Sequence, residues 1–267
     1  MRDELRCENR RALWASERLV LLARGRKIGS RVTAFVGGTR ENYPVAMSVD
    51  EDRTAALRLV PVSRETLARL DIYVALLAKW RNTINLISDA SFAQVWTRHI
   101  ADSAQLLAFA PDARIWVDLG SGAGFPGMVL AIQLADTPGA TVHLVEIDKR
   151  KCAFLREAAR AAGAPAVVHN VRIEEAPARI ADAVDAVTAR ALAPLPRLID
   201  FCNIWLNVGA VGIFPRGKTL EAIHSSDYSK YAIEFSRSRT DPMSAIAVVK
   251  ARSPLIEAPA PVCRPEP

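Results

Sequence analysis

The chain has 267 residues, of which half are hydrophobic and 24% are charged, a composition typical of a globular protein with an ample core. It contains no run of about 18 uncharged apolar residues, which argues against a membrane-spanning helix, and its charged start does not resemble a secretory signal. The four cysteines are scattered without a C-x-x-C pair, which argues against a structural zinc site and a disulfide framework and favours a reducing, cytoplasmic location.

The net charge of +6 is concentrated at one end of the chain. Residues 1–46 hold ten lysines and arginines against five acids, whereas the remainder is close to neutral. This segment also lacks the periodicity of a helix or strand. We therefore expect residues 1–46 to be a disordered extension or the product of an over-called start codon; a basic arm that contacts nucleic acid is the alternative.

Two helices are expected in residues 47–110, which we interpret as a helical region that packs on the core. In residues 63–82 apolar side chains recur three or four positions apart, as on one face of a helix: Leu67, Leu70, Val74, Leu77 and Trp80. A second helix is predicted over residues 89–109. His99 and Asp102 are neighbours on it, and a packing and hydrogen-bonding pair is favoured over a catalytic dyad.

The most informative stretch is residues 115–148. A short apolar run, Ile115–Leu119, predicts a buried strand, and glycines follow at 120, 122 and 124, where the backbone can bend and approach a ligand. A helix over residues 128–134 and a second strand, 142–145, lead to Glu146, placed where doubly wound proteins bind ribose hydroxyls. The pattern D-x-G-x-G-x-G from Asp118 favours S-adenosylmethionine. The overlapping G-x-G-x-x-G from Gly122 leaves an NAD-type dinucleotide open.

Helices and strands alternate beyond this point. Helices are predicted over 149–162 and 194–207, strands over 166–169, 185–189 and 210–214, and a closing hairpin over 232–237 and 245–250. An antiparallel hairpin after five parallel strands is typical of methyltransferases. The pattern predicts a Rossmann-like class I S-adenosylmethionine-dependent α/β fold for residues 111–252, with a central, mostly parallel seven-stranded sheet, helices on both faces and the N-terminal helical extension. The Pro-rich tail, 253–267, is expected to be disordered.

Three arginines follow the carboxyl ends of predicted strands: Arg172, Arg190 and Arg216. Because those ends meet at one edge of a parallel sheet, we expect the three side chains to line the same rim as Glu146. Arginine forms forked hydrogen bonds with guanine and with phosphate, so the rim favours an anionic or guanine-bearing substrate.

Four sequence blocks resemble the RsmG (GidB) family of bacterial methyltransferases of small-subunit ribosomal RNA: K-W-R-N-T-I-N-L-I-S (79–88), R-H-I-A-D-S (98–103), V-D-L-G-S-G-A-G-F-P-G (117–127) and T-A-R-A-L-A (188–193). The resemblance covers about residues 63–250. It implies methyl transfer from S-adenosylmethionine, with S-adenosylhomocysteine as product, to guanine N7 in the 530 loop of 16S rRNA, at position 527. The near-neutral remainder of the chain favours 16S rRNA presented by the 30S subunit or an assembly intermediate over bare RNA. We also expect a cytoplasmic monomer, with neither metal nor membrane.

The resemblance also assigns positions to the site. The cofactor positions map onto Gly120, Gly122, Phe125, Glu146, Ile173, Glu174 and Arg190. We expect Arg172 and Arg216 to position the guanine or its phosphates, and no catalytic base is evident. Where relatives commonly carry Lys-Gly, this chain has Arg216-Gly217, so the role of that position is open. The alternatives are a methyltransferase acting on another RNA, a protein or a small molecule, and a nicotinamide oxidoreductase or non-catalytic nucleotide binder.

Overall fold

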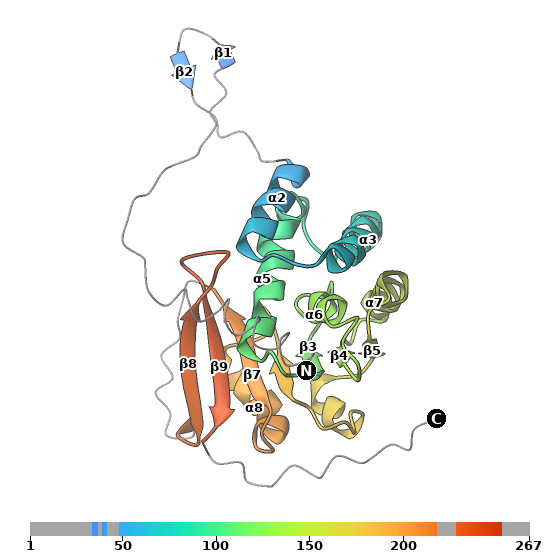
Figure 1. Cartoon of the computed structure of the whole chain (residues 1–267), viewed down its shortest axis with the longest axis vertical. Coiled ribbons are helices and arrows are strands. Elements are labelled where there is room, and N and C mark those ends of the chain that lie inside the picture. Colours follow the sequence, from blue (N-terminus) through green and yellow to red (C-terminus); the bar gives the residue numbers. More distant parts are fainter. Residues whose placement is uncertain (1–33, 37–38, 42–47, 218–227, 253–267) are drawn as a thin grey trace, which may run out of the picture. The chain divides into compact units, whose positions relative to one another are not determined.

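A computed structural model describes residues 34–36, 39–41, 48–217 and 228–252. The chain divides into two compact units, 1–46 and 47–267. In the first unit, strands β1 (Ala34–Val36) and β2 (Thr39–Glu41) pair antiparallel (Figure 1). The remainder of the predicted extension 1–46 and the tail 253–267 lie outside the described residues.

The second unit begins with two capped helices. Helix α2 (Val49–Leu59) starts after Ser48, which forms a reciprocal capping box with Glu51. The sequence had not indicated this helix. Helix α3 (Arg64–Trp80) starts after Ser63, whose side chain accepts a hydrogen bond from the Thr66 amide, as the predicted helix 63–82 requires.

The prediction of one continuous helix over 89–109 is wrong. The segment consists of α4 (Asp89–Phe92), the π-helix η2 (Trp96–Ala101), a short α5 (Asp102–Ala104) and the 3-10 helix η3 (Gln105–Phe109). The break has a distant cause. The buried carboxylate of Asp52, in α2, accepts hydrogen bonds from the Trp96 amide (2.8 Å) and from the amide and hydroxyl of Thr97. The Asp52 carboxylate therefore caps the start of a new helix, because it accepts from amides that would otherwise bond to carbonyls of the preceding turn.

One seven-stranded sheet forms the centre of the second unit, in the order β5-β4-β3-β6-β7-β9-β8 (Figure 1). Its strands are β3 (Ile115–Leu119), β4 (Thr141–Val145), β5 (Ala166–His169), β6 (Ala186–Thr188), β7 (Val211–Arg216), β8 (Tyr231–Arg237) and β9 (Ala245–Ala251). The first five are parallel, β9 inserts antiparallel beside β7, and β8 pairs antiparallel with β9. The predicted class I methyltransferase fold is confirmed, and the inserted antiparallel strand departs from the continued βα units expected of a dinucleotide-binding oxidoreductase.

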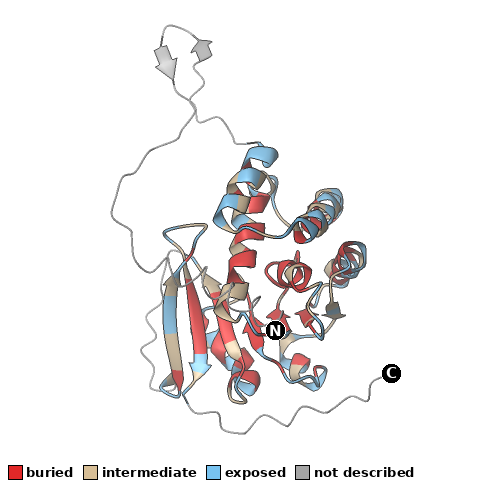
Figure 2. Ribbon diagram, in the orientation of Figure 1, coloured by how far each residue is buried: buried red, intermediate tan, exposed pale blue. Residues whose placement is uncertain are grey.

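Helices cover both faces of this sheet. The side chains of β3 alternate between two hydrophobic clusters. Trp116 packs with residues of α3, α6 (Gly127–Gln133) and α7 (Lys149–Ala162), whereas Val117 packs with residues of α8 (Leu195–Leu206). The central strands are accordingly buried on both sides (Figure 2). Within the described residues, no helix combines the length and apolar character needed to cross a bilayer.

Candidate functional site

The candidate site lies where the direction of the strand order reverses. From β3 the chain adds β4 and β5 on one side, and then returns to add β6 and β7 on the other. The carboxyl ends of strands at such a point form the ligand crevice of open α/β sheets. In this protein the crevice receives the glycine loop after β3, Glu146 after β4 and Arg190 after β6.

The glycine loop is shaped by two different requirements. Gly122 has φ +56°, a conformation that side chains other than glycine adopt rarely, and a Cβ built there would meet only the Gly120 carbonyl oxygen, at 3.8 Å. The loop is therefore open toward a ligand at this residue. At Gly127 a Cβ would lie 2.6 Å from Asp118 Oδ2, so the absent side chain allows α6 to start against β3.

Glu146 holds the glycine loop directly. Its buried carboxylate accepts the Gly122 amide at Oε2 and the Asp148 amide at Oε1, both at 2.8 Å. A carboxylate offers about four acceptor positions, so each oxygen keeps one for a hydroxyl of a nucleoside ribose. Glu146 can thus fix the loop and bind a ligand at once.

Asp118, beneath the loop, has unmet hydrogen-bonding capacity. Its Oδ2 accepts the Gly127 amide at 3.1 Å, but Oδ1 is buried and has no hydrogen-bond partner among the described residues. The hydroxyl of Thr188, its register neighbour on β6, is likewise buried and without a partner in that part of the chain. Burial raises the pKa of Asp118 to about 6. A ligand that brings donor groups would satisfy these atoms, and the ammonium of S-adenosylmethionine is such a donor, so the residues present fit this cofactor.

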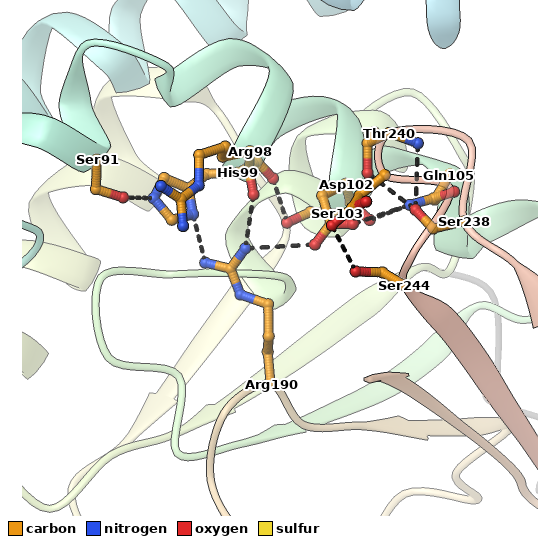
Figure 3. Close-up of polar contacts among 11 residues, drawn as sticks. Ser91, Arg98, His99, Asp102, Ser103, Gln105, Arg190, Ser238, Thr240 and Ser244 are labelled. Atoms are coloured by element: carbon orange, nitrogen blue, oxygen red, sulfur yellow. Dashed lines mark hydrogen bonds and ion pairs between the residues drawn. The ribbon is translucent and has the colours of Figure 1, made fainter. Parts of the chain in front are cut away.

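Arg190 connects the sheet edge to the helical region (Figure 3). It is followed by Ala191 in a left-handed conformation, with φ +53°, an uncommon backbone for alanine. Its guanidinium donates to His99 Nδ1 (2.8 Å) and to the Arg98 carbonyl (3.2 Å), and it pairs with Asp102 at 3.5 Å. Burial lowers the pKa of Arg190, although an arginine remains charged at any working pH.

His99 is held as a neutral ring. Because arginine only donates hydrogen bonds, Nδ1 of His99 must be the acceptor, so Nε2 carries the proton and donates to Ser91 Oγ at 2.5 Å. Burial lowers the pKa of His99 to about 3. The ring stacks on Phe125 of the glycine loop, with centroids 4.7 Å apart. His99 and Asp102 therefore both bind the Arg190 guanidinium, as expected of a packing and hydrogen-bonding pair.

The other predicted cofactor positions differ in exposure. The Phe125 ring is buried among His99, Tyr73 and the Arg190 guanidinium, which lies 5.0 Å from its centroid, so we expect a cofactor to meet mainly its main chain. Ile173 and Glu174 begin the 3-10 helix η4 (Ile173–Ala178) after β5, where Ile173 is half-buried and Glu174 is exposed.

The structure places all three arginines at the same sheet edge but does not bring them together. Arg216 ends β7 and donates to the Ala193 carbonyl at 2.9 Å, so it lies against the segment that follows Arg190. Arg172 is exposed and only weakly paired with Glu174, at 4.0 Å. Strands β5 and β7 are four places apart in the sheet, or about 19 Å at ~4.8 Å per strand. Arg172 and Arg216 therefore suit different points of a polynucleotide better than one base.

Tyr73 is a contributor to the loop that the sequence reasoning missed. Its hydroxyl donates to the Ala123 carbonyl at 2.5 Å, and its ring contacts Phe125 edge-on. Tyr73 belongs to the buried face of α3 with Leu70 and Leu77. A tyrosine on an apolar helix face needs a partner for its hydroxyl, and that was the available signal.

Comparison with known proteins places the chain in a family. The family model described as rRNA small subunit methyltransferase G matches residues 66–244. A relative of that name from Bradyrhizobium diazoefficiens is 52% identical over 191 residues, which are 71% of this chain and 74% of the relative. Another, from Parvibaculum lavamentivorans, is 49% identical over 205 residues, 76% of this chain and 89% of the relative. A solved rRNA methylase from Streptococcus thermophilus has a TM-score of 0.41 at 14% identity, covering 58% of this chain and 97% of its own. The chain belongs to the rRNA small subunit methyltransferase G (GidB) family.

Proposed function

We propose that this protein transfers the methyl group of S-adenosylmethionine to N7 of a guanosine in the 530 loop of 16S rRNA. The observation that carries the proposal is the combination, at one sheet edge, of the Glu146-bound glycine loop with Arg216, which ends β7, and Arg172, which follows β5. The loop fits a nucleoside cofactor with an amino-acid moiety, and the arginines fit a guanine or its phosphates.

The side chains present are consistent with N7 as the acceptor. Guanine N7 has a free lone pair, so the new N7–carbon bond can form while the sulfur–carbon bond breaks, and no proton has to leave the base. S-adenosylmethionine supplies the electrophilic methyl group. At the end of β6 the chain has Thr188-Ala189-Arg190 where methylases of exocyclic amines carry an Asn/Asp-Pro-Pro motif.

A cysteine nucleophile, required for methylation of pyrimidine C5, has no candidate in the described site. Cys152 and Cys202, the two cysteines of the described chain, are fully buried in α7 and α8. Burial raises the pKa of both thiols, which disfavours the reactive thiolate.

The residues of the chain therefore act by holding and orienting. Glu146 and the glycine loop would hold the nucleoside, Asp118 would accept from the ammonium, and Arg190 orients the loop through Phe125. Arg216 and Arg172 place the RNA along the rim. Fixing both reactants in line accounts for catalysis without a general base. We further propose that the enzyme acts in the cytoplasm as a monomer and meets its RNA in the 30S subunit or an assembly intermediate.

Mapping of N7-methylguanosine in 16S rRNA tests the proposal. A strain lacking the gene should lose one modified guanosine in the 530 loop, and the purified protein with S-adenosylmethionine should restore it on 30S subunits from that strain. A Glu146→Ala protein, which lacks the carboxylate that holds the loop, should not. Restoration of a methyl group elsewhere, or none at all with a folded protein, would reject the assignment.

A further inference from the structure

We propose that Asp102 is a positioning residue that, together with Thr240 between β8 and β9, holds the Arg190 guanidinium against Phe125 and so keeps the glycine loop in the shape that binds the cofactor. The inference rests on the proposed function, because it assigns the glycine loop to the methyl donor. It adds a role for the C-terminal hairpin, which lies far from the glycine loop in sequence.

Asp102 is a carboxylate with several fixed donors (Figure 3). Its Oδ1 accepts from the Thr240 hydroxyl at 2.9 Å and from Gln105 Nε2 at 3.0 Å, and its Oδ2 lies 3.5 Å from Arg190 Nη1. The side chains of Asp102 and Arg190 are each only 18% exposed, so solvent screens their attraction little.

The hairpin is locked to the helical segment that carries Asp102. The Gln105 side chain accepts the Arg239 amide at 2.8 Å and donates to Ser238 Oγ at 3.0 Å, and Ser238 Oγ in turn accepts the Thr240 amide at 3.2 Å. The Thr240 hydroxyl is thereby aimed at Asp102 (Figure 3).

The Arg190 guanidinium is held against the glycine loop. It donates to His99 Nδ1 at 2.8 Å, its central carbon lies 5.0 Å from the centroid of the Phe125 ring, and the His99 ring stacks on Phe125. The hydrogen bonds from Thr240 and Gln105 orient Asp102, which pairs with this guanidinium. Loss of that orientation would let Arg190 move away from His99 and Phe125 and would loosen the glycine loop, where the methyl donor is expected to bind.

The test is calorimetric binding of S-adenosylhomocysteine to the full chain. Asp102→Asn should raise the Kd about tenfold, the cost of one lost charge-assisted hydrogen bond, and Thr240→Val should raise it about threefold. Asp102→Glu should restore part of the affinity. Asp112→Asn removes an exposed carboxylate just after the same helical segment and serves as the control. Thr240→Val should have no further effect in an Asp102→Asn background, because both changes act through one carboxylate.

The outcomes separate the inference from the proposed function. Unchanged affinity in a folded Asp102→Asn or Thr240→Val protein, or additive effects of the two changes, would overturn the positioning role. If Asp102→Asn does not fold in a melting experiment, the Thr240→Val result decides alone. A wild-type protein that binds S-adenosylhomocysteine but leaves 16S rRNA unmodified would instead reject the proposed substrate, and the binding data would still decide the role of Asp102.

Discussion

Ionised Asp118 lowers the stability of the folded protein, and a bound ligand that donates hydrogen bonds to it would offset this loss. Its carboxylate is fully buried and keeps one oxygen without a partner in the described chain, and burial raises its pKa to about 6 from an ordinary value of 3.8. Because the folded state holds the Asp118 proton more tightly than the unfolded state, stability falls as pH rises through this window. Above pH 6 the ionised group costs the ligand-free protein about 3 kcal/mol, from ~1.4 kcal/mol for each pH unit between the two values.

The first prediction concerns Asp118→Asn in the ligand-free protein. The amide carries no charge, so the variant should be more stable than wild type at pH 8, by up to about 3 kcal/mol, and this advantage should disappear near pH 4. Urea unfolding between pH 4 and 8 measures it. The same variant should bind S-adenosylhomocysteine more weakly. An equal stability change at pH 4 and pH 8 would show that burial of the charge is not the cause.

The second prediction concerns Arg216. It ends β7, two strands from β3, and its guanidinium donates to the Ala193 carbonyl in the segment after β6. Arg216→Ala should lower kcat/KM on 30S subunits at least about tenfold, because the RNA is less well positioned, and change the Kd for S-adenosylhomocysteine little. Arg197→Ala, which removes an exposed arginine stacked on Phe201 of α8, is the control. A comparable loss of cofactor affinity would move Arg216 into the cofactor site.

At the scale of elements, most of the fold followed from local signals. The strand Ile115–Leu119 and the helix Lys149–Ala162 have the predicted bounds, because apolar runs, caps and a glycine stop lie within the segments themselves. Asp148 caps that helix and Gly163 ends it in a left-handed conformation. The broken helix after residue 89 could not be predicted in this way, since its cap comes from Asp52, 44 residues before Trp96.

The third prediction tests that cap. Asp52→Ala removes a buried carboxylate that accepts from Trp96 and Thr97 and leaves their donors without partners. The free energy of unfolding should fall by about 3 kcal/mol, the sum of a lost cap and a charge-assisted hydrogen bond. Asp50→Ala, at an exposed position in the same first turn of α2, should change it far less. Equal effects of the two substitutions in urea unfolding would contradict the role of Asp52 as cap.

The residues of the site likewise differ in whether their neighbours in space are also near in sequence. The glycine loop and Glu146 could be predicted because they lie within one contiguous βαβ unit with a known spacing. The partners of Arg190 could not, because His99 lies 91 residues before it. Thr240, which orients Asp102, is 138 residues from Asp102 and reaches it only once the sheet has formed. The sequence indicated that three arginines share a rim, but their separation depends on the order of the strands, which sequence alone did not show.

At the scale of the whole molecule, most of the net positive charge lies in residues 1–46, the first of the two units. The unit formed by residues 47–267 holds 25 lysines and arginines against 24 acids, so its net charge is close to zero. Affinity for bare RNA grows with the number of phosphates that cationic side chains neutralise. A near-neutral net charge favours few phosphate contacts, so we expect specificity to come from the shape of an RNA that the ribosomal particle holds in place.

The fourth prediction follows from this balance. The protein should methylate 30S subunits at least about tenfold faster than protein-free 16S rRNA, because a structured particle presents the loop without the entropic cost of ordering free RNA. Initial rates with both substrates measure this.

If the rim contacts about three phosphates, raising salt from ~50 to ~200 mM should weaken RNA binding about twentyfold, whereas a broad basic surface would give a far steeper loss. Equal rates on the two substrates would mean that the enzyme recognises the loop by itself, and a steep salt dependence would assign RNA binding to the basic residues 1–46 instead of the sheet edge.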